Sequence, residues 1–270
     1  MLKLKVILLI AIFLINKPCW ANTPNEKSIP FTFKDSFIFV DANMSNDTKG
    51  TSYSLLFDLG DYRAISLTPK ALAKVPHKKL NQFETFQDYK GKTFKSQRFV
   101  LPYLAIGELI FQEQVGSEDI HDPTNPSPSP HGAVGSGLFI NKTLTIDFAK
   151  EKLIISDEFL SSCSKFSPES GAIVSEVYID GIKSHFIIDT GSQFSLIDSK
   201  HLASLDHEKS QKAEVTIKEF TTSDFSVKDL KLKELSLNIP GIDGIIGQDL
   251  LKEHQLSIDF TNSCFKFVSD

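Results

Sequence analysis

The stretch Phe186-Ile187-Ile188-Asp189-Thr190-Gly191-Ser192 sets one acidic residue at the end of an apolar run, where a glycine-containing turn begins. An apolar run of this kind, bounded by a turn signal, is typical of a buried β-strand. A carboxylate at the end of such a strand is positioned by rigid backbone and still reaches the surface. General acids and bases need both properties, so the stretch indicates hydrolytic chemistry at Asp189.

The same pattern occurs earlier, at Leu55-Leu56-Phe57-Asp58-Leu59-Gly60, where three apolar residues precede Asp, one residue and Gly. Downstream of each acid lies a matching pair of segments, Gly132-Ala133-Val134-Gly135 and Gly244-Ile245-Ile246-Gly247. An apolar strand ending in Ile-Asp-Phe follows each of them, at 146–148 and 258–260. The downstream segments keep a constant offset of 112 residues, so the sequence predicts two copies of one structural unit.

The first copy is longer between its two motifs, because the acid motifs are 131 residues apart and the downstream motifs only 112. We expect the extra length to fall between Phe111 and His131. That region contains the Pro-rich run 122–130, which predicts an exposed loop.

Short apolar or alternating runs bounded by Gly, Asp, Asn or Pro predict a mostly β structure. The expected strands are 37–40, 54–57, 99–101, 144–148, 153–155, 174–179, 186–188 and 256–260, and short helical turns are expected at 69–74, 198–204 and 248–253. We therefore predict an all-β fold with an N-terminal lobe at 36–160, a small polar linker at 161–171 and a C-terminal lobe at 172–270.

Residues 1–21 are interpreted as a signal peptide that is cleaved after Ala21. Lys3 and Lys5 precede an apolar run of ten residues, which is too short to span a membrane. We expect an exported protein, periplasmic or secreted, with no membrane span. Cys163 and Cys264 would then lie in an oxidising compartment, where they could form one disulfide or stay apart as two thiols.

Charge and motifs exclude several function classes. The signal peptide holds three of the 29 Lys and Arg residues and no acid, so its removal changes the net charge from −5 to −8. Such an acidic chain argues against nucleic acid as a partner. The His and Cys spacing matches no metal site, and the sequence has no nucleophile elbow or phosphate-binding glycine loop. No metal and no cofactor is expected.

Taken together, the two Asp-x-Gly turns and the two downstream apolar-apolar-Gly motifs resemble the pepsin/retropepsin superfamily of two-lobed aspartic proteases. Among them the chain is most similar to bacterial exported proteins with tandem retropepsin-like domains. The resemblance covers roughly residues 36 to 268. It implies two homologous β-barrel lobes around a central cleft, a monomer with pseudo-two-fold lobes, and a peptide or protein substrate.

The resemblance also implies residue roles. Asp58 and Asp189 would be the catalytic pair that shares one proton and activates a water molecule. Gly60 and Gly191 would allow the tight turns, Thr190 would hydrogen-bond across the lobe interface, and Ser192 would orient Asp189. A flap over the site is expected at 86–93, which includes Tyr89, or at 211–221.

The first lobe departs from the family pattern at two positions. Leu59 stands where a hydroxyl residue is expected, and Asp61 adds a carboxylate that would raise the pKa of Asp58. One interpretation is an active enzyme in which Asp58 is the protonated partner. Another is a degenerate lobe, in which the protein only binds extended peptides. A third is an enzyme driven by the second lobe alone, paired with its copy in a dimer.

Overall fold

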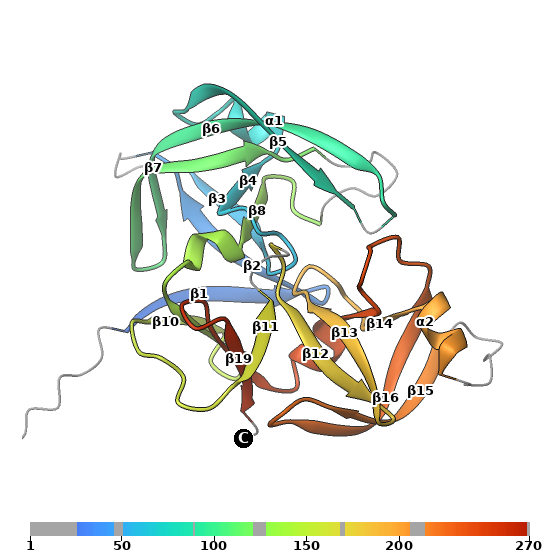
Figure 1. The fold of residues 1–270 in the computed structure, drawn as a ribbon. Helices are drawn as coiled ribbons and strands as arrows, with labels where there is room; N and C mark the ends of the chain where they lie inside the picture. The colour runs from blue at the N-terminus through green and yellow to red at the C-terminus, as the bar shows by residue number, and fades with distance from the viewer. Residues whose placement is uncertain are drawn as a thin grey trace, which may run out of the picture.

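The computed structural model describes residues 26–45, 51–88, 90–120, 128–167, 171–205 and 214–268. These residues form two β-rich lobes (Figure 1), and the lobes are joined by a shared sheet. The predicted signal peptide at 1–21 lies outside the described residues, as do most of the Pro-rich run and residues 211–213 of the second flap candidate.

The first lobe is an all-β unit with two short helical segments. Its elements are β1 (Lys27–Lys34), β2 (Phe37–Asn43), β3 (Ser52–Asp58), β4 (Ile65–Leu67), α1 (Pro69–Leu72), β5 (Lys78–Gln87), β6 (Thr93–Ile106), β7 (Leu109–Glu118), β8 (Gly132–Gly135), the 3₁₀ helix η1 (Ser136–Phe139), β9 (Thr143–Asp147) and β10 (Lys152–Ser156).

The second lobe repeats this style with fewer described strands. Its elements are β11 (Ser164–Ser167), β12 (Val174–Ile179), β13 (Ile182–Ile188), β14 (Leu196–Asp198), α2 (Ser199–Ser204), β15 (Glu214–Thr221), β16 (Ser226–Leu235), β17 (Gly244–Ile246), α3 (Gln248–Leu251), β18 (Gln255–Asp259) and β19 (Cys264–Val268). The expected strands and helical turns all coincide with elements of the structure to within a few residues. None of the described helices is long and apolar enough to cross a membrane.

An antiparallel sheet in the order β1-β10-β9-β18-β19-β11 joins the lobes, with β9 and β18 at its centre. Thr145 of β9 pairs directly with Ser257 of β18, and their hydroxyl oxygens are 2.8 Å apart. These residues are 112 positions apart, the offset seen in the sequence. Equivalent residues of the two lobes therefore face each other across a local two-fold axis.

The two lobes place their acidic turns with the same strand pairings. Strand β3 runs parallel to β8, as β13 runs parallel to β17. Strand β4 pairs antiparallel with β8 and parallel with β7, as β14 pairs with β17 and β16. Phe57 and Ile188, which directly precede the two acids, are fully buried. Each acid is thus held at the end of a strand that is anchored in its own core.

The prediction for the extra length of the first lobe was wrong for most of it. The offset between equivalent residues is 131 at Ser66 and Ile197, falls to 117 at Ser117 and Glu234, and reaches 112 only at β8 and β17. Most of the extra residues therefore lie before β7, in the hairpin β5–β6. Strand β5 reads KKLNQFETFQ and is too polar to show an apolar alternation.

Structure also begins earlier, and continues further, than the predicted lobe boundaries. Strand β1 precedes residue 36 and pairs with both β10 and β2. The predicted linker contains β11, which pairs with β19 and β12. Beside it Cys163 and Cys264 form a disulfide, with their Cα atoms 5.6 Å apart. The segment between the lobes is therefore tied to the end of the chain.

We expect that replacing both Cys163 and Cys264 by Ser lowers the free energy of unfolding by about 2–5 kcal/mol. The bond closes a loop of 101 residues, and its loss restores conformational freedom to the unfolded chain. Urea unfolding of the double variant beside the oxidised wild type measures this. A double variant as stable as the wild type would show that the disulfide does not stabilise the fold.

Candidate active site

The carboxyl groups of Asp58 and Asp189 are hydrogen-bonded to each other across the lobe junction. Both residues are half-buried, so each carboxyl is surrounded by protein while an edge of the residue reaches the surface. The structure thus brings together the two acids that the sequence singled out. They come from strands of different lobes, 131 residues apart.

Gly60 and Gly191 each lie against the carboxyl group of the opposite lobe. A Cβ atom on Gly60 would stand 2.7 Å from Asp189 Cγ, and one on Gly191 would stand 2.6 Å from Asp58 Cγ. The Gly60 N–H donates to Asp58 Oδ1 at 2.8 Å, and the Gly191 N–H donates to Asp189 Oδ1 at 2.7 Å. Any side chain at either glycine would push the two acids apart.

The hydroxyl of Thr190 bridges the lobes. It donates to the Phe57 carbonyl at 2.9 Å and accepts from the Leu59 N–H at 2.8 Å, and the site of both bonds is buried. Leu59 itself is fully buried among apolar residues. The first lobe therefore takes part in this bridge through its backbone, while only the second lobe supplies a hydroxyl.

The turn after Asp189 is held by polar residues, two of which the sequence analysis missed. The Ser192 hydroxyl donates to the Phe194 carbonyl at 2.8 Å, while its N–H supports Asp189. The Gln248 side chain donates to the Thr190 carbonyl at 2.9 Å, and Asp249 accepts from the Ser195 hydroxyl at 2.6 Å. Two polar residues placed directly after an apolar-apolar-Gly motif were the available signal.

Asp61 is neutralised by an arginine. Its carboxylate accepts from Arg63 Nε at 2.8 Å and from Arg63 Nη2 at 2.8 Å, and only about a tenth of either side chain is exposed. The Asp61 carbonyl accepts from the N–H and the hydroxyl of Ser136, at 2.8 and 3.1 Å. Asp61 thus fixes the turn after Asp58, a role that the sequence analysis did not assign.

The two acids of the pair have unequal pKa values. Burial, the charge of Asp189 and the charge of Asp61 together raise the pKa of Asp58 well above its ordinary value. Burial also raises the pKa of Asp189, but hydrogen bonds from Asp58 and from backbone N–H groups oppose the shift. The shared proton therefore resides on Asp58, and Asp189 is the ionised member. This favours the first of the three interpretations.

The hairpin β5–β6 carries the first flap candidate, 86–93, at its tip. The Lys90 carbonyl accepts a hydrogen bond from Asn238 Nδ2 at 3.2 Å. Asn238 follows β16 in the second lobe, so the tip of the hairpin crosses to the other lobe (Figure 1). Tyr89 lies outside the described residues. The second candidate, 211–221, largely forms β15, which is paired on both sides by β12 and β16.

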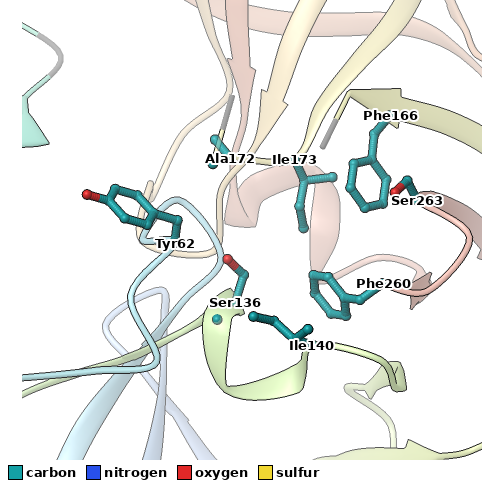
Figure 2. A pocket seen from close by; sticks show the side chains of 10 residues that line it. Tyr62, Ser136, Ile140, Phe166, Ala172, Ile173, Phe260 and Ser263 are labelled. Carbon is teal, nitrogen blue, oxygen red and sulfur yellow. The ribbon is translucent and has the colours of Figure 1, made fainter. Parts of the chain in front are cut away.

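A cavity of about 280 Å³ lies between the lobes, beside the turn that follows Asp58. Figure 2 shows the side chains of Ile140, Phe166, Ile173 and Phe260 pointing toward one another around it, with Tyr62 at one end. The Ile173 carbonyl accepts from the N–H of Ile188, the residue before Asp189. The cavity therefore adjoins the acidic turns of both lobes. In the part of the chain that the structure describes, no group of His, Cys, Asp and Glu side chains could hold a metal ion.

No protein-family model matches this chain, and no curated protein matches it in sequence. Among solved structures, the chain is similar to the crystal structure of an aspartic proteinase from Irpex lacteus. The TM-score is 0.59 at 15% sequence identity, and the match covers 90% of this chain and 97% of that one. The chain therefore has the mostly β, two-lobed fold of a pepsin-like aspartic proteinase.

We expect Asp58→Asn to stabilise the protein increasingly as the pH rises. A raised folded-state pKa contributes stability that is full below the ordinary value of 3.8 and is lost as the pH rises through the folded pKa. Asparagine, which cannot ionise, escapes that loss. The gain over wild type approaches roughly 1.4 kcal/mol for each unit of pKa shift.

Urea unfolding at several pH values between about 3 and 8 measures this gain. Asp35→Asn, at an exposed side chain, serves as the control and is expected to show no such trend. A pH-independent difference between Asp58→Asn and wild type would contradict the raised pKa.

We expect Thr190→Val to lower the free energy of unfolding by about 1–3 kcal/mol, because it leaves the buried Leu59 N–H and Phe57 carbonyl without their partner. The exposed strand residue Thr216 offers a matched control, for which the same substitution is expected to change stability by less than about 0.5 kcal/mol. Chemical unfolding of both variants tests this, and equal stabilities would mean that the bridge contributes nothing.

Proposed function

We propose that this protein is an aspartic endopeptidase in which Asp58 and Asp189 activate a water molecule to hydrolyse peptide bonds. The observation that carries the proposal is the hydrogen-bonded pair of carboxyl groups, each packed against the glycine of the opposite turn. Two carboxyls in contact share one proton, so the pair offers an acid and a base at one place. The fold shared with a solved aspartic proteinase supports the same conclusion.

In the proposed reaction, a water molecule lies between the two carboxyl groups and the scissile carbonyl. Asp189 takes a proton from this water while Asp58 gives its proton to the carbonyl oxygen, and the water oxygen bonds to the carbonyl carbon. The carbon–nitrogen bond then breaks as the leaving nitrogen takes the proton from Asp189. The new carboxyl group forms as Asp58 recovers its own proton. No covalent enzyme intermediate is needed.

A second candidate function is peptide binding without catalysis. Leu59 supports it, since the first lobe lacks the hydroxyl that a symmetric site would have. The salt bridge from Arg63 to Asp61 argues the other way, because it reduces the effect of the added carboxylate on Asp58. A dimer driven by the second lobe is not needed to bring two acids together, since one chain supplies both. We therefore propose that the protein acts as a monomer on peptide or protein substrates.

We further propose that the protein is exported to the periplasm or secreted, as one of the bacterial proteins with tandem retropepsin-like domains. The signal-like segment at 1–21 supports export. The disulfide between Cys163 and Cys264 supports an oxidising compartment. The acidic net charge of −5 argues against nucleic acid as a partner.

The proposed function predicts that protein 22–270 cleaves unfolded polypeptide at some pH between about 3 and 7, and that Asp58→Asn and Asp189→Asn each lower kcat/KM by roughly 100-fold or more. Mass spectrometry of an unfolded protein digest measures the cleavage. Asp41→Asn, at an exposed strand position, is expected to keep full activity. Peptide binding without turnover at any pH would support the binding module instead.

A further inference from the structure

A second cavity of about 280 Å³ lies within the first lobe, beside the interlobe cavity. It is lined by the turn after Asp58 and by residues of β5, β6 and β7. Tyr62, Gly137 and Ile140 line both cavities. Figure 2 shows Tyr62 at the end of the interlobe cavity, with its hydroxyl pointing away from the apolar side chains. The two cavities therefore adjoin at Tyr62.

Three buried polar atoms of this cavity have no hydrogen-bond partner among the described residues: Arg63 Nη1, Glu84 Oε1 and Arg98 Nε. The side chain of Arg63 is nine-tenths buried. Folded proteins leave few buried polar atoms unpaired, because each costs about 1–3 kcal/mol. Three such atoms around one cavity indicate that a polar group binds there.

The unpaired donors are held in place. Arg63 is clamped by Asp61, and its guanidinium lies over the ring of Phe86, 4.6 Å from the ring centre. Nη1 therefore cannot turn toward Asp61 without breaking these contacts. Arg98 uses Nη1 to contact Gln82 at 3.4 Å, which leaves Nε facing the cavity.

The charges around the cavity favour a neutral ligand group. The guanidinium of Arg63 is already compensated by Asp61 and faces Asp119 at 3.8 Å. Arg98 and Glu84 contribute one charge of each sign. A carboxylate would bond to the arginines but face the carboxylate of Glu84, whereas an ammonium would bond to Glu84 but face both arginines. A group with an acceptor and a donor satisfies all three atoms.

We propose that this cavity binds a primary carboxamide, supplied by a Gln or Asn side chain of a bound peptide. Its oxygen accepts from Arg63 Nη1 and Arg98 Nε, and its NH₂ group donates to Glu84 Oε1. That this peptide is a substrate rests on the proposed function; the binding of a carboxamide does not. The adjoining apolar cavity would receive a neighbouring apolar side chain, so the recognised sequence would pair an apolar residue with Gln or Asn.

The test is a specificity switch at Glu84. Glu84→Gln replaces the only carboxylate among the three unpaired atoms with a group that can donate, so the cavity then suits a carboxylate. A randomised peptide library is selected for binding to immobilised Asp189→Asn protein, with and without Glu84→Gln. The parent is expected to enrich Gln or Asn about tenfold over Glu and Asp at one position. Glu84→Gln is expected to reverse that preference toward Glu.

Two controls keep the test decisive. Glu253→Gln makes the same chemical change at an exposed side chain of the second lobe and is expected to keep the parent preference. A measurement without any substitution in the cavity compares one selected peptide with its Gln→Glu and Gln→Leu versions on the wild-type chain. The Gln peptide is expected to bind about tenfold more tightly than either.

Each outcome decides the proposal. No preference for Gln or Asn in the parent would mean that the cavity holds water only, and would overturn the inference. An unchanged preference in a folded Glu84→Gln variant would overturn it as well. If the switch is seen while the wild-type chain cleaves none of the selected peptides, the carboxamide site stands and the proposed peptidase function fails.

Discussion

Two carboxyl groups in hydrogen-bonding contact are the constraint on which the rest of the structure depends. Like charges at this separation repel, so the protein must fix Asp58 and Asp189 from several directions at once. Buried strands anchor each acid, a glycine of the opposite turn leaves room for it, and the Thr190 hydroxyl ties the two turns together. The central sheet, with Thr145 facing Ser257, sets the local symmetry that makes these contacts reciprocal.

The two halves of this arrangement are chemically unequal, and the inequality has a direction. The second lobe supplies the bridging hydroxyl and more backbone donors to its acid, so Asp189 is the better-supported carboxylate. The first lobe adds Asp61, whose charge raises the pKa of Asp58 although Arg63 balances most of it. The departures from symmetry therefore assign the proton to one partner instead of abolishing the pair. The same arginine also links the acidic turn to the polar cavity beside the hairpin.

The sequence alone predicted the features that leave a local pattern. Apolar runs ending in Asp-x-Gly located both acids, their glycines and Thr190, and repeated motifs indicated the two lobes. Features that depend on distant contacts were missed. The strand Lys78–Gln87 is too polar to be recognised without its partner β6. The clamp of Arg63 on Asp61 and the contact of Gln248 with Thr190 carry no periodic signal, since they arise where separate turns meet in space.

The most direct measurement is a titration of the Asp58 and Asp189 carboxyl carbons by NMR, in protein labelled at aspartate and assigned with the two Asn variants. The account predicts one proton shared by the pair over a wide pH range, with Asp58 protonated well above the ordinary aspartate pKa while Asp189 is already ionised. Independent titration of both groups near that ordinary value would contradict it, because two separate carboxylates could not act together on one water molecule.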